Sequence, residues 1–152
     1  MDILERKVLT EVTVMKYLVP IDGSKQSMAA VEYAAKLAEK FEGSTITLAY
    51  VIMYEPYFMD SPELIEKNGQ AKASVVLDEA EKMLASYSGI GVRKVIEHGS
   101  SAADKIVELA ETGKHDAIVM GSQGLSNLKR FLMGSVSTRV SQYAPCTVVL
   151  VR

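Results

Sequence analysis

A glycine-rich segment in the last third of the chain contains the residues best suited to bind an anion. Gly121, Gly124 and Gly134 follow a Gly-x2-Gly-x9-Gly spacing, and Ser135 comes directly after the third glycine. Glycine permits tight turns and positive φ angles, so that successive backbone N–H groups can point into one concavity. Gly134 also precedes a helical pattern, and the free N–H groups and positive dipole end of a helix N-terminus favour phosphate. The spacing therefore predicts a phosphate-binding loop.

Hydroxyl groups add to this segment, because Ser135, Ser137 and Thr138 fall in the first turn of the predicted helix. The segment is not a P-loop, since Gly-x-x-x-x-Gly-Lys-Ser/Thr is absent, and no Gly-x-Gly-x-x-Gly follows the first predicted strand. A single glycine in such a loop more often only ends a strand or begins a helix. Three glycines at this spacing favour a ligand.

A second candidate is the segment Val19-Pro20-Ile21-Asp22-Gly23-Ser24, which ends the first predicted strand and enters the first helix. Asp22 thereby lies at the carboxyl end of a strand, where open α/β sheets bind their ligands. Its carboxylate could accept from a ribose or a base, or face a metal held by phosphates. The alternative is that Asp22 only caps the helix, and the residues alone leave the two readings open.

Other chemistries find less support in the sequence. His98 and His115 stand apart from other potential ligands, so a zinc site is not expected. No serine is paired with an obvious base and orienting group, which argues against a hydrolytic triad. Cys146 is the single cysteine and lies in an apolar segment, a usage that fits a reducing compartment.

The elements that must position these residues alternate along the chain. The predicted strands are Tyr17–Asp22, Thr45–Ile52, Val92–Glu97, Asp116–Gly121 and Cys146–Val151. Helical periodicity separates them, with Ser24 and Ser101 as predicted N-caps. The order βαβαβαβαβ predicts an α/β fold with a parallel sheet and helices on both faces. Residues 55–69 are predicted as a long, proline-marked loop.

The composition restricts the class of protein. At 152 residues, 48% of them apolar, the chain is long enough for one globular core. A net charge of −2 argues against binding nucleic acid or an anionic membrane by charge alone, so any anion site must be local. The longest apolar segment, Leu48–Tyr54, is too short to span a bilayer, and the N-terminus lacks the pattern of a signal peptide. We expect a cytoplasmic protein.

The chain resembles the universal stress protein family. The resemblance rests on Gly121-x2-Gly124-x9-Gly134-Ser135, on Val-Pro-Ile-Asp-Gly-Ser at the first strand, and on Tyr-Ala-Pro-Cys-Thr-Val-Val-Leu-Val before the C-terminus. It covers residues 16–152 as a single domain and leaves residues 1–15 as a leader or an extra edge strand. It implies a three-layer, Rossmann-like fold, of the adenine nucleotide alpha hydrolase type, with an open parallel sheet in strand order 3-2-1-4-5. A homodimer is also implied, and we expect it to form through the C-terminal strand, because an apolar strand at the edge of a sheet invites pairing with its copy.

The resemblance further implies a ligand, which is ATP or AMP, with Mg²⁺ or Mn²⁺ held by the phosphates. Asp22 would hold the adenosine end, the backbone near Val51 would contact the adenine, and Gly121 would lie against the ribose. The phosphates would be held mainly by backbone N–H groups of the glycine-rich segment. The full set of site residues carried over by motif position is Pro20, Asp22, Val51, Gly121, Gly124, Gly134, Ser135, Val136 and Ser137.

The resemblance implies a regulatory function, in which bound nucleotide alters what the dimer contacts during stress. No residue is obviously placed to activate water, so ATP hydrolysis should be at most slow, and dedicated turnover is not expected. Two alternatives stay open. One is a nucleotidyl transferase or ATP pyrophosphatase-like enzyme that uses the loop at residues 54–69 as a wall for a second substrate. The other is a dimeric scaffold whose glycine loop is empty.

Overall fold

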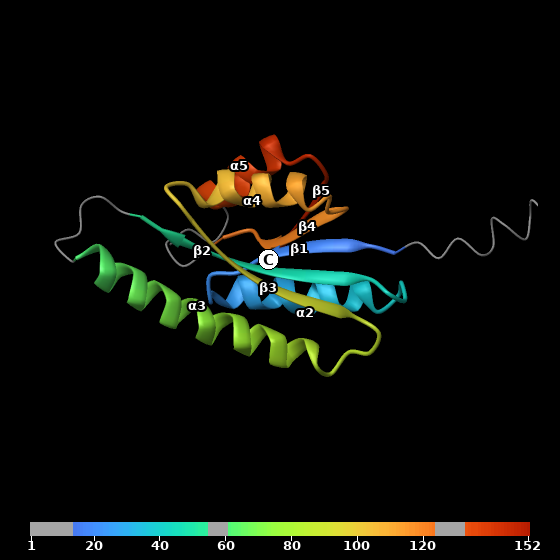
Figure 1. Cartoon of the computed structure of the whole chain (residues 1–152). Coiled ribbons are helices and arrows are strands. Elements are labelled where there is room, and N and C mark those ends of the chain that lie inside the picture. Colours follow the sequence, from blue (N-terminus) through green and yellow to red (C-terminus); the bar gives the residue numbers. More distant parts are fainter. Residues whose placement is uncertain (1–13, 55–60, 124–132) are drawn as a thin grey trace, which may run out of the picture.

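Strands and helices alternate along the chain, as the sequence predicts. The computed structural model describes residues 14–54, 61–123 and 133–152 (Figure 1). The strands are β1 (Lys16–Pro20), β2 (Thr45–Met53), β3 (Gly91–Gly99), β4 (Ala117–Gly121) and β5 (Thr147–Val151). The helices are α2 (Lys25–Ala38), α3 (Pro62–Leu84), α4 (Ala102–Thr112) and α5 (Ser135–Tyr143). Residues 1–13, on which most of the predicted leader falls, lie outside the described part.

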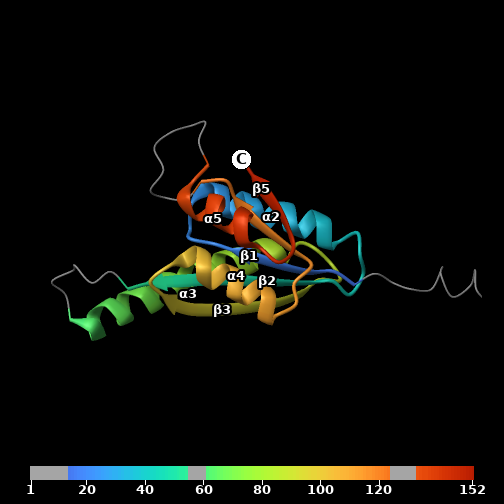
Figure 2. The same cartoon turned by 90° about the horizontal axis from the view of Figure 1, so that it is seen from above.

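The five strands form one parallel sheet in the order β3-β2-β1-β4-β5. The chain first winds outward from β1 to β3, then returns past β1 to continue as β4 and β5. Since crossovers between parallel strands are right-handed, this reversal places the later helices on the opposite face. Figure 1 shows α2 and α3 on one face of the sheet and α4 and α5 on the other, and Figure 2 views the same fold from the side of α4 and α5. The predicted fold class and strand order are confirmed.

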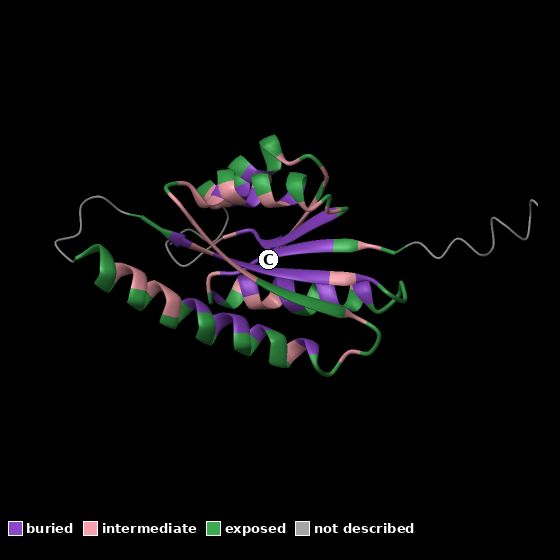
Figure 3. Ribbon diagram, in the orientation of Figure 1, coloured by how far each residue is buried: buried purple, intermediate pink, exposed green. Residues whose placement is uncertain are grey.

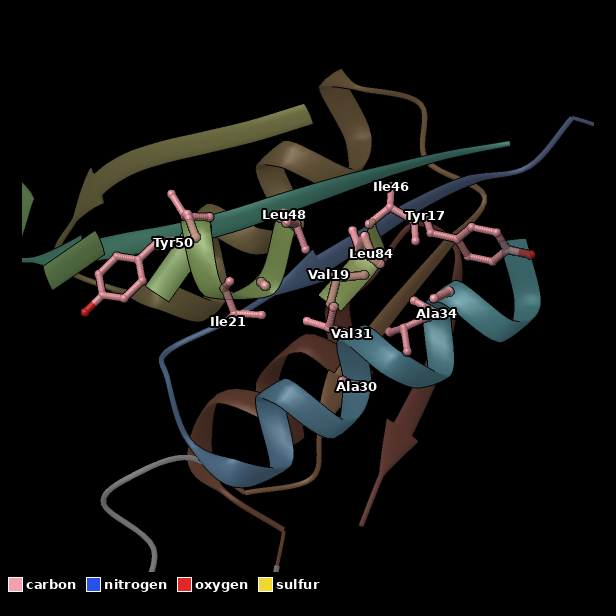
Figure 4. Close-up of a cluster of buried hydrophobic side chains, with 14 of the residues drawn as sticks. Tyr17, Val19, Ile21, Ala30, Val31, Ala34, Ile46, Leu48, Tyr50 and Leu84 are labelled. Carbon is pink, nitrogen blue, oxygen red and sulfur yellow. The ribbon is translucent and has the colours of Figure 1, made fainter. Parts of the chain in front are cut away.

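Two hydrophobic cores lie on the two faces of the sheet. Tyr17 and Val19 of β1 belong to the core on the face covered by α2 and α3. Leu18, which lies between them, belongs to the core on the face covered by α4 and α5. This alternation follows from the two-residue period of a strand. Figure 4 shows the first core, in which the strand side chains meet Ala30 and Val31 of α2. The small alanines allow α2 to lie close to the sheet.

The edge strands are less buried than the central ones (Figure 3). Residues 117–120 of β4 are fully buried, as their continuous apolar sequence predicts, whereas residues 148–151 of β5 are only half-buried. The difference arises because β5 has a neighbouring strand on one side only. β3, at the other edge, is exposed over its first four residues.

The helices begin largely where the sequence predicts. The Ser24 hydroxyl accepts from the Ser27 N–H, and the Ser101 hydroxyl accepts from the Asp104 N–H. Both serines are therefore N-caps, which satisfy otherwise free donors of the first turn. Within the described ranges, no helix combines the length and the apolar character needed to cross a membrane.

The predicted loop before the second helix is wrong for residues 62–69, which form the first turns of α3. Ser61 caps the helix, and Pro62 occupies its first turn, where the missing N–H of proline costs nothing. The proline and Gly69 are the residues that predict a loop from the sequence alone. Residues 55–60 of the predicted loop lie outside the described part.

Gly69 lies inside α3 because the helix approaches β2 closely at that point. A Cβ at position 69 would lie 2.8 Å from Cγ2 of Ile52, a distance that real Cβ atoms do not show. Ile52 is buried and β-branched, so its Cγ2 methyl cannot swing far without disturbing the core. Glycine therefore sets the distance between α3 and the sheet.

His115 joins the end of α4 to β2. Its Nδ1 lies 3.1 Å from the Leu109 carbonyl oxygen, and its Nε2 lies 3.1 Å from the Thr47 hydroxyl. A carbonyl only accepts, so Nδ1 carries the proton and Nε2 accepts from Thr47. Burial is the main cause that lowers the pKa of His115 below its ordinary value of 6.5. The neutral imidazole is thus the form that the fold favours.

We expect Gly69→Ala to lower the free energy of unfolding by about 1 kcal/mol, because the clash with Ile52 outweighs the gain in helix propensity. Urea denaturation measures this. Asn68→Ala, at the adjacent exposed position, provides the control and should leave stability unchanged or slightly raised. A more stable Gly69→Ala protein would contradict the close packing.

We expect His115 to make the fold less stable in acid. Because its pKa is lower in the folded than in the unfolded state, the unfolded chain takes up the proton first, and stability falls as the pH drops through and below 6.5. Urea denaturation of the wild type and His115→Gln at about pH 8 and about pH 5.5 tests this. The loss on acidification should be smaller in the variant, and an equal loss in both would exclude His115 as its source.

Candidate functional site

A cavity of about 610 Å³ opens at the carboxyl ends of β1, β2 and β4. These strands flank the point where the winding of the sheet reverses, which is where open α/β sheets bind ligands. The described residues that line it are Pro20, Ile21, Asp22, Ser24, Ser27, Ala49, Val51, Met53, Lys72, Ala102, Ile106, Met120, Gly121, Gln123, Gly134, Ser135, Val136 and Ser137.

The turn from β1 into α2 forms one wall and presents Asp22 to the cavity. Gly23 has a φ of +84°, a left-handed conformation that favours glycine. Asp22 Oδ1 accepts from the Ser24 N–H at 2.9 Å, which fixes the carboxylate beside the turn. Since Ser24 is the N-cap of α2, the alternative that Asp22 caps this helix is wrong. Asp22 braces the turn and faces the cavity.

Gly121, at the end of β4, allows two backbones to meet at the base of the cavity. A Cβ at this position would lie 3.0 Å from the Gln26 carbonyl carbon and 3.1 Å from the Ser27 backbone nitrogen. The expected positive φ is not found at Gly121, so close packing against α2 is the reason for glycine. Gln26 strengthens the same junction, because its Oε1 accepts from the Gln123 N–H at 2.8 Å.

The N-terminus of α5 forms the opposite wall. Gly134 is its N-cap and contributes no side-chain cap, so the first N–H groups of the helix have no intrahelical partner. The Gly134 N–H itself donates to the Ser122 carbonyl at 2.8 Å, which ties the helix to the end of β4. Ser135 and Val136, the first two residues of the helix, line the cavity, so the positive end of the helix dipole lies at the cavity wall.

The sequence suggested that Ser137 offers its hydroxyl group to a ligand, but the structure uses this group within the protein. Its side chain is buried, and its Oγ lies 2.7 Å from the Ser122 carbonyl oxygen and 3.0 Å from the Gly134 carbonyl oxygen. The hydroxyl proton is therefore engaged in holding α5 to β4. Ser135 is exposed at the cavity, and within the described part its hydroxyl makes no hydrogen bond. Of the three hydroxyl groups in the first turn of α5, the one on Ser135 has its proton available to a ligand, since those of Ser137 and Thr138 donate to carbonyl groups.

The structure brings together eight of the nine residues carried over by motif position. These are Pro20, Asp22, Val51, Gly121, Gly134, Ser135, Val136 and Ser137. Gly124 lies outside the described residues. The cavity is also lined by Lys72 of α3 and by an apolar wall of Met53, Ile106 and Met120, which the sequence does not predict. No local signal marks these residues, because packing of distant elements brings them to the cavity.

The charges at the cavity are few. Of its described lining residues, Lys72 alone is basic and Asp22 alone is acidic. Burial raises the pKa of Tyr50, and the nearby Asp22 carboxylate adds to the rise. Within the same described part, no group of three or more His, Cys, Asp or Glu residues is placed to hold a metal ion.

A polar cluster lies where β2 and β3 end against α3. His98 Nε2 lies 2.9 Å from each carboxylate oxygen of Glu66, and the Tyr54 ring stacks on His98 with centroids 5.5 Å apart. Gln70 Nε2 donates to Glu66 at 2.8 Å, and this bond is the main cause that lowers the Glu66 pKa, followed by the bond with His98. The cluster ties the first turns of α3 to the carboxyl ends of β2 and β3, the end of the sheet at which the cavity opens.

Comparison with known sequences places the chain near a single family. The family model of the universal stress protein family matches residues 13–152. The chain is similar to Universal stress protein MJ0531 of Methanocaldococcus jannaschii, with 33% identity over 141 residues that cover 90% of this chain and 81% of that protein.

Solved structures that resemble this chain include members of the same family. Universal stress protein UspA from Lactobacillus plantarum superposes with a TM-score of 0.78 at 25% identity, over 91% of this chain and 97% of that one. A universal stress protein solved in complex with cAMP gives a TM-score of 0.67 at 25% identity, again over 91% and 97% of the two chains.

We expect Ser137→Ala to lower the free energy of unfolding by about 1 kcal/mol, because a buried hydrogen bond between α5 and β4 is lost. Thermal or urea denaturation measures the change. Ser135→Ala is the matched control, two residues away on the exposed side of the same helix turn, and should unfold like the wild type. Equal stability of both variants would show that the Ser137 hydroxyl does not hold this junction.

Proposed function

The chain belongs to the universal stress protein family, and we propose that it binds an adenine nucleotide in the cavity at the ends of β1, β2 and β4. One observation carries the proposal. The Asp22 turn, the end of β2 and the N-terminus of α5 line a single cavity, although they are far apart in the sequence. Its volume of about 610 Å³ lies within the range of small-molecule sites, about 300–1,000 Å³.

The nucleoside would occupy the part of the cavity near β1 and β2. Val51 and Met53 offer apolar surface for the flat faces of a base, and Ile106 and Met120, which belong to the same hydrophobic core as Val51, complete this surface. A carboxylate accepts well from neutral donors, so Asp22 suits a ribose hydroxyl or the amino group of adenine. This combination of apolar walls and one placed polar group is typical of ligand sites.

The phosphates would lie at the N-terminus of α5. The free N–H groups of Ser135 and Val136 and the helix dipole favour an anion without a formal positive charge nearby. The Ser135 hydroxyl adds one more donor. Gly124, predicted for the same end of the ligand, stays a prediction.

The choice of adenine nucleotide is supported by the structural relative that was solved with cAMP. We extend this to ATP or AMP because of the Gly-x2-Gly-x9-Gly-Ser spacing. The described lining offers no cluster of metal ligands, so Mg²⁺ or Mn²⁺ would enter with the nucleotide, held mainly by its phosphates.

We propose a regulatory function rather than rapid turnover. The described lining contains no histidine, and its one carboxylate, Asp22, sits with the β1–α2 turn rather than with α5, where the phosphates would lie. Without a base to activate water, hydrolysis should be slow. The transferase alternative loses part of its basis, since residues 62–69 of its supposed substrate-binding loop are helical.

The same proposal includes a homodimer formed through β5. The outer edge of β5 is unpaired within the described sheet, and the half-buried Val148, Val149 and Leu150 make it apolar. The opposite edge strand, β3, carries Arg93 and Lys94 at exposed positions, and such charges protect an edge from pairing. An apolar edge pairs readily with its own copy about a two-fold axis.

Isothermal titration of the purified protein with ATP, AMP and cAMP, with and without Mg²⁺, tests nucleotide binding. Gly134→Val should weaken ATP binding about tenfold or more, because branched carbons at the N-cap obstruct the N–H groups of α5. Thr138→Val, in the same turn but off the cavity, controls for the substitution. If the wild type binds none of the three nucleotides, the proposal is wrong.

Val149→Lys should shift the protein toward monomer, because the charge must be desolvated in a paired edge. Light scattering measures the mass, and circular dichroism checks that the variant is folded. Val92→Lys, on the opposite edge strand, is the matched control and should leave the mass unchanged. A dimer that survives the β5 substitution would exclude this interface.

A further inference from the structure

Lys72 is the one basic side chain among the described residues that line the cavity. It lies on α3, an element that the family motif does not reach, and it is exposed rather than buried. No ion pair joins its ammonium group to another side chain in the described part of the protein. The charge is therefore available to a ligand.

Two close contacts hold the turn of α3 that carries Lys72. Three residues before it, Gly69 lets the helix pack directly on Ile52 of β2. Four residues after it, Val76 packs on the β1–α2 turn, where a Cβ at Gly23 would lie 3.0 Å from Val76 Cγ2. Positions three and four apart share one face of a helix. Lys72 thus sits between two fixed points on the face that looks toward the sheet and the turn.

The position of Lys72 selects one end of the cavity. It shares with Asp22 the lining of the main cavity and of a second hollow of about 550 Å³ beside the β1–α2 turn. α3 lies on the face of the sheet opposite to α5 (Figure 1). The ammonium group therefore belongs with the Asp22 wall, away from the N-terminus of α5 where the phosphates are proposed to lie.

We propose that Lys72 is a further binding residue that donates a hydrogen bond to the base of the nucleotide, beside the acceptor Asp22. The inference rests on the proposed function and deepens it. Adenine carries an amino donor beside ring-nitrogen acceptors, which matches one carboxylate and one ammonium group on the same wall.

The test compares Lys72→Met with the wild type in calorimetric titrations of adenosine, AMP and ATP. Methionine keeps the length and helix propensity of lysine but removes the donor and the charge. We expect affinity to fall about tenfold for all three ligands, since a hydrogen bond from a charged group is lost at the base that they share. Lys67→Met is the matched control, because it makes the same change at an exposed position of α3 off both cavities. It should bind like the wild type.

The outcomes separate this inference from the proposed function. A wild type that binds none of the three ligands overturns both. A wild type that binds, with Lys72→Met binding equally well, overturns the role of Lys72 alone. A loss seen with ATP but absent with adenosine would place Lys72 at the phosphates and also contradicts the proposal. Thermal midpoints of both lysine variants that equal the midpoint of the wild type establish that neither substitution unfolds α3.

Discussion

The contact between the end of β4 and the start of α2 is the constraint on which the cavity depends. The chain reaches β4 from the far face of the sheet, yet β4 must lie beside β1, so the two halves of the fold meet here. Gly121 lets its backbone touch that of Gln26 and Ser27, and Gln26 binds the Gln123 N–H. The junction holds the Asp22 turn and the N-terminus of α5 around the same space. A larger residue at position 121 would separate the walls at their base.

A near-neutral protein can offer an anion site here because the favourable charge is carried by backbone dipoles. The N-terminus of α5 supplies free N–H groups, and the bonds of Ser137 and Gly134 to the Ser122 carbonyl keep that end in place. The two formal charges of the described lining, Asp22 and Lys72, lie together at the other wall. One end of the cavity is therefore suited to an anion, and the other end offers a hydrogen-bond donor and an acceptor side by side.

Glycine in this fold serves packing as much as turning. Gly23 needs its left-handed backbone, but Gly69 and Gly121 have ordinary φ values and are required because a neighbouring group lies too close for a Cβ. Both contacts set distances at the cavity: Gly69 fixes how near α3 comes to β2, and Gly121 fixes how near β4 comes to α2. The position of the ligand-facing residues therefore depends on interior steric contacts as well as on the loops that carry them.

The sequence by itself determined the alternation of elements, the N-caps at Ser24 and Ser101, and, through its resemblance to a family, the strand order. These follow from short-range chemistry, since capping, periodicity and glycine spacing act over a few residues. Only the tertiary structure decided that α3 starts at Pro62, that the Ser137 hydroxyl points inward, and that Lys72 faces the cavity. Lys72 and Asp22 are fifty positions apart, and no local pattern encodes a distance that is set by the packing of α3 on β2 and on the β1–α2 turn.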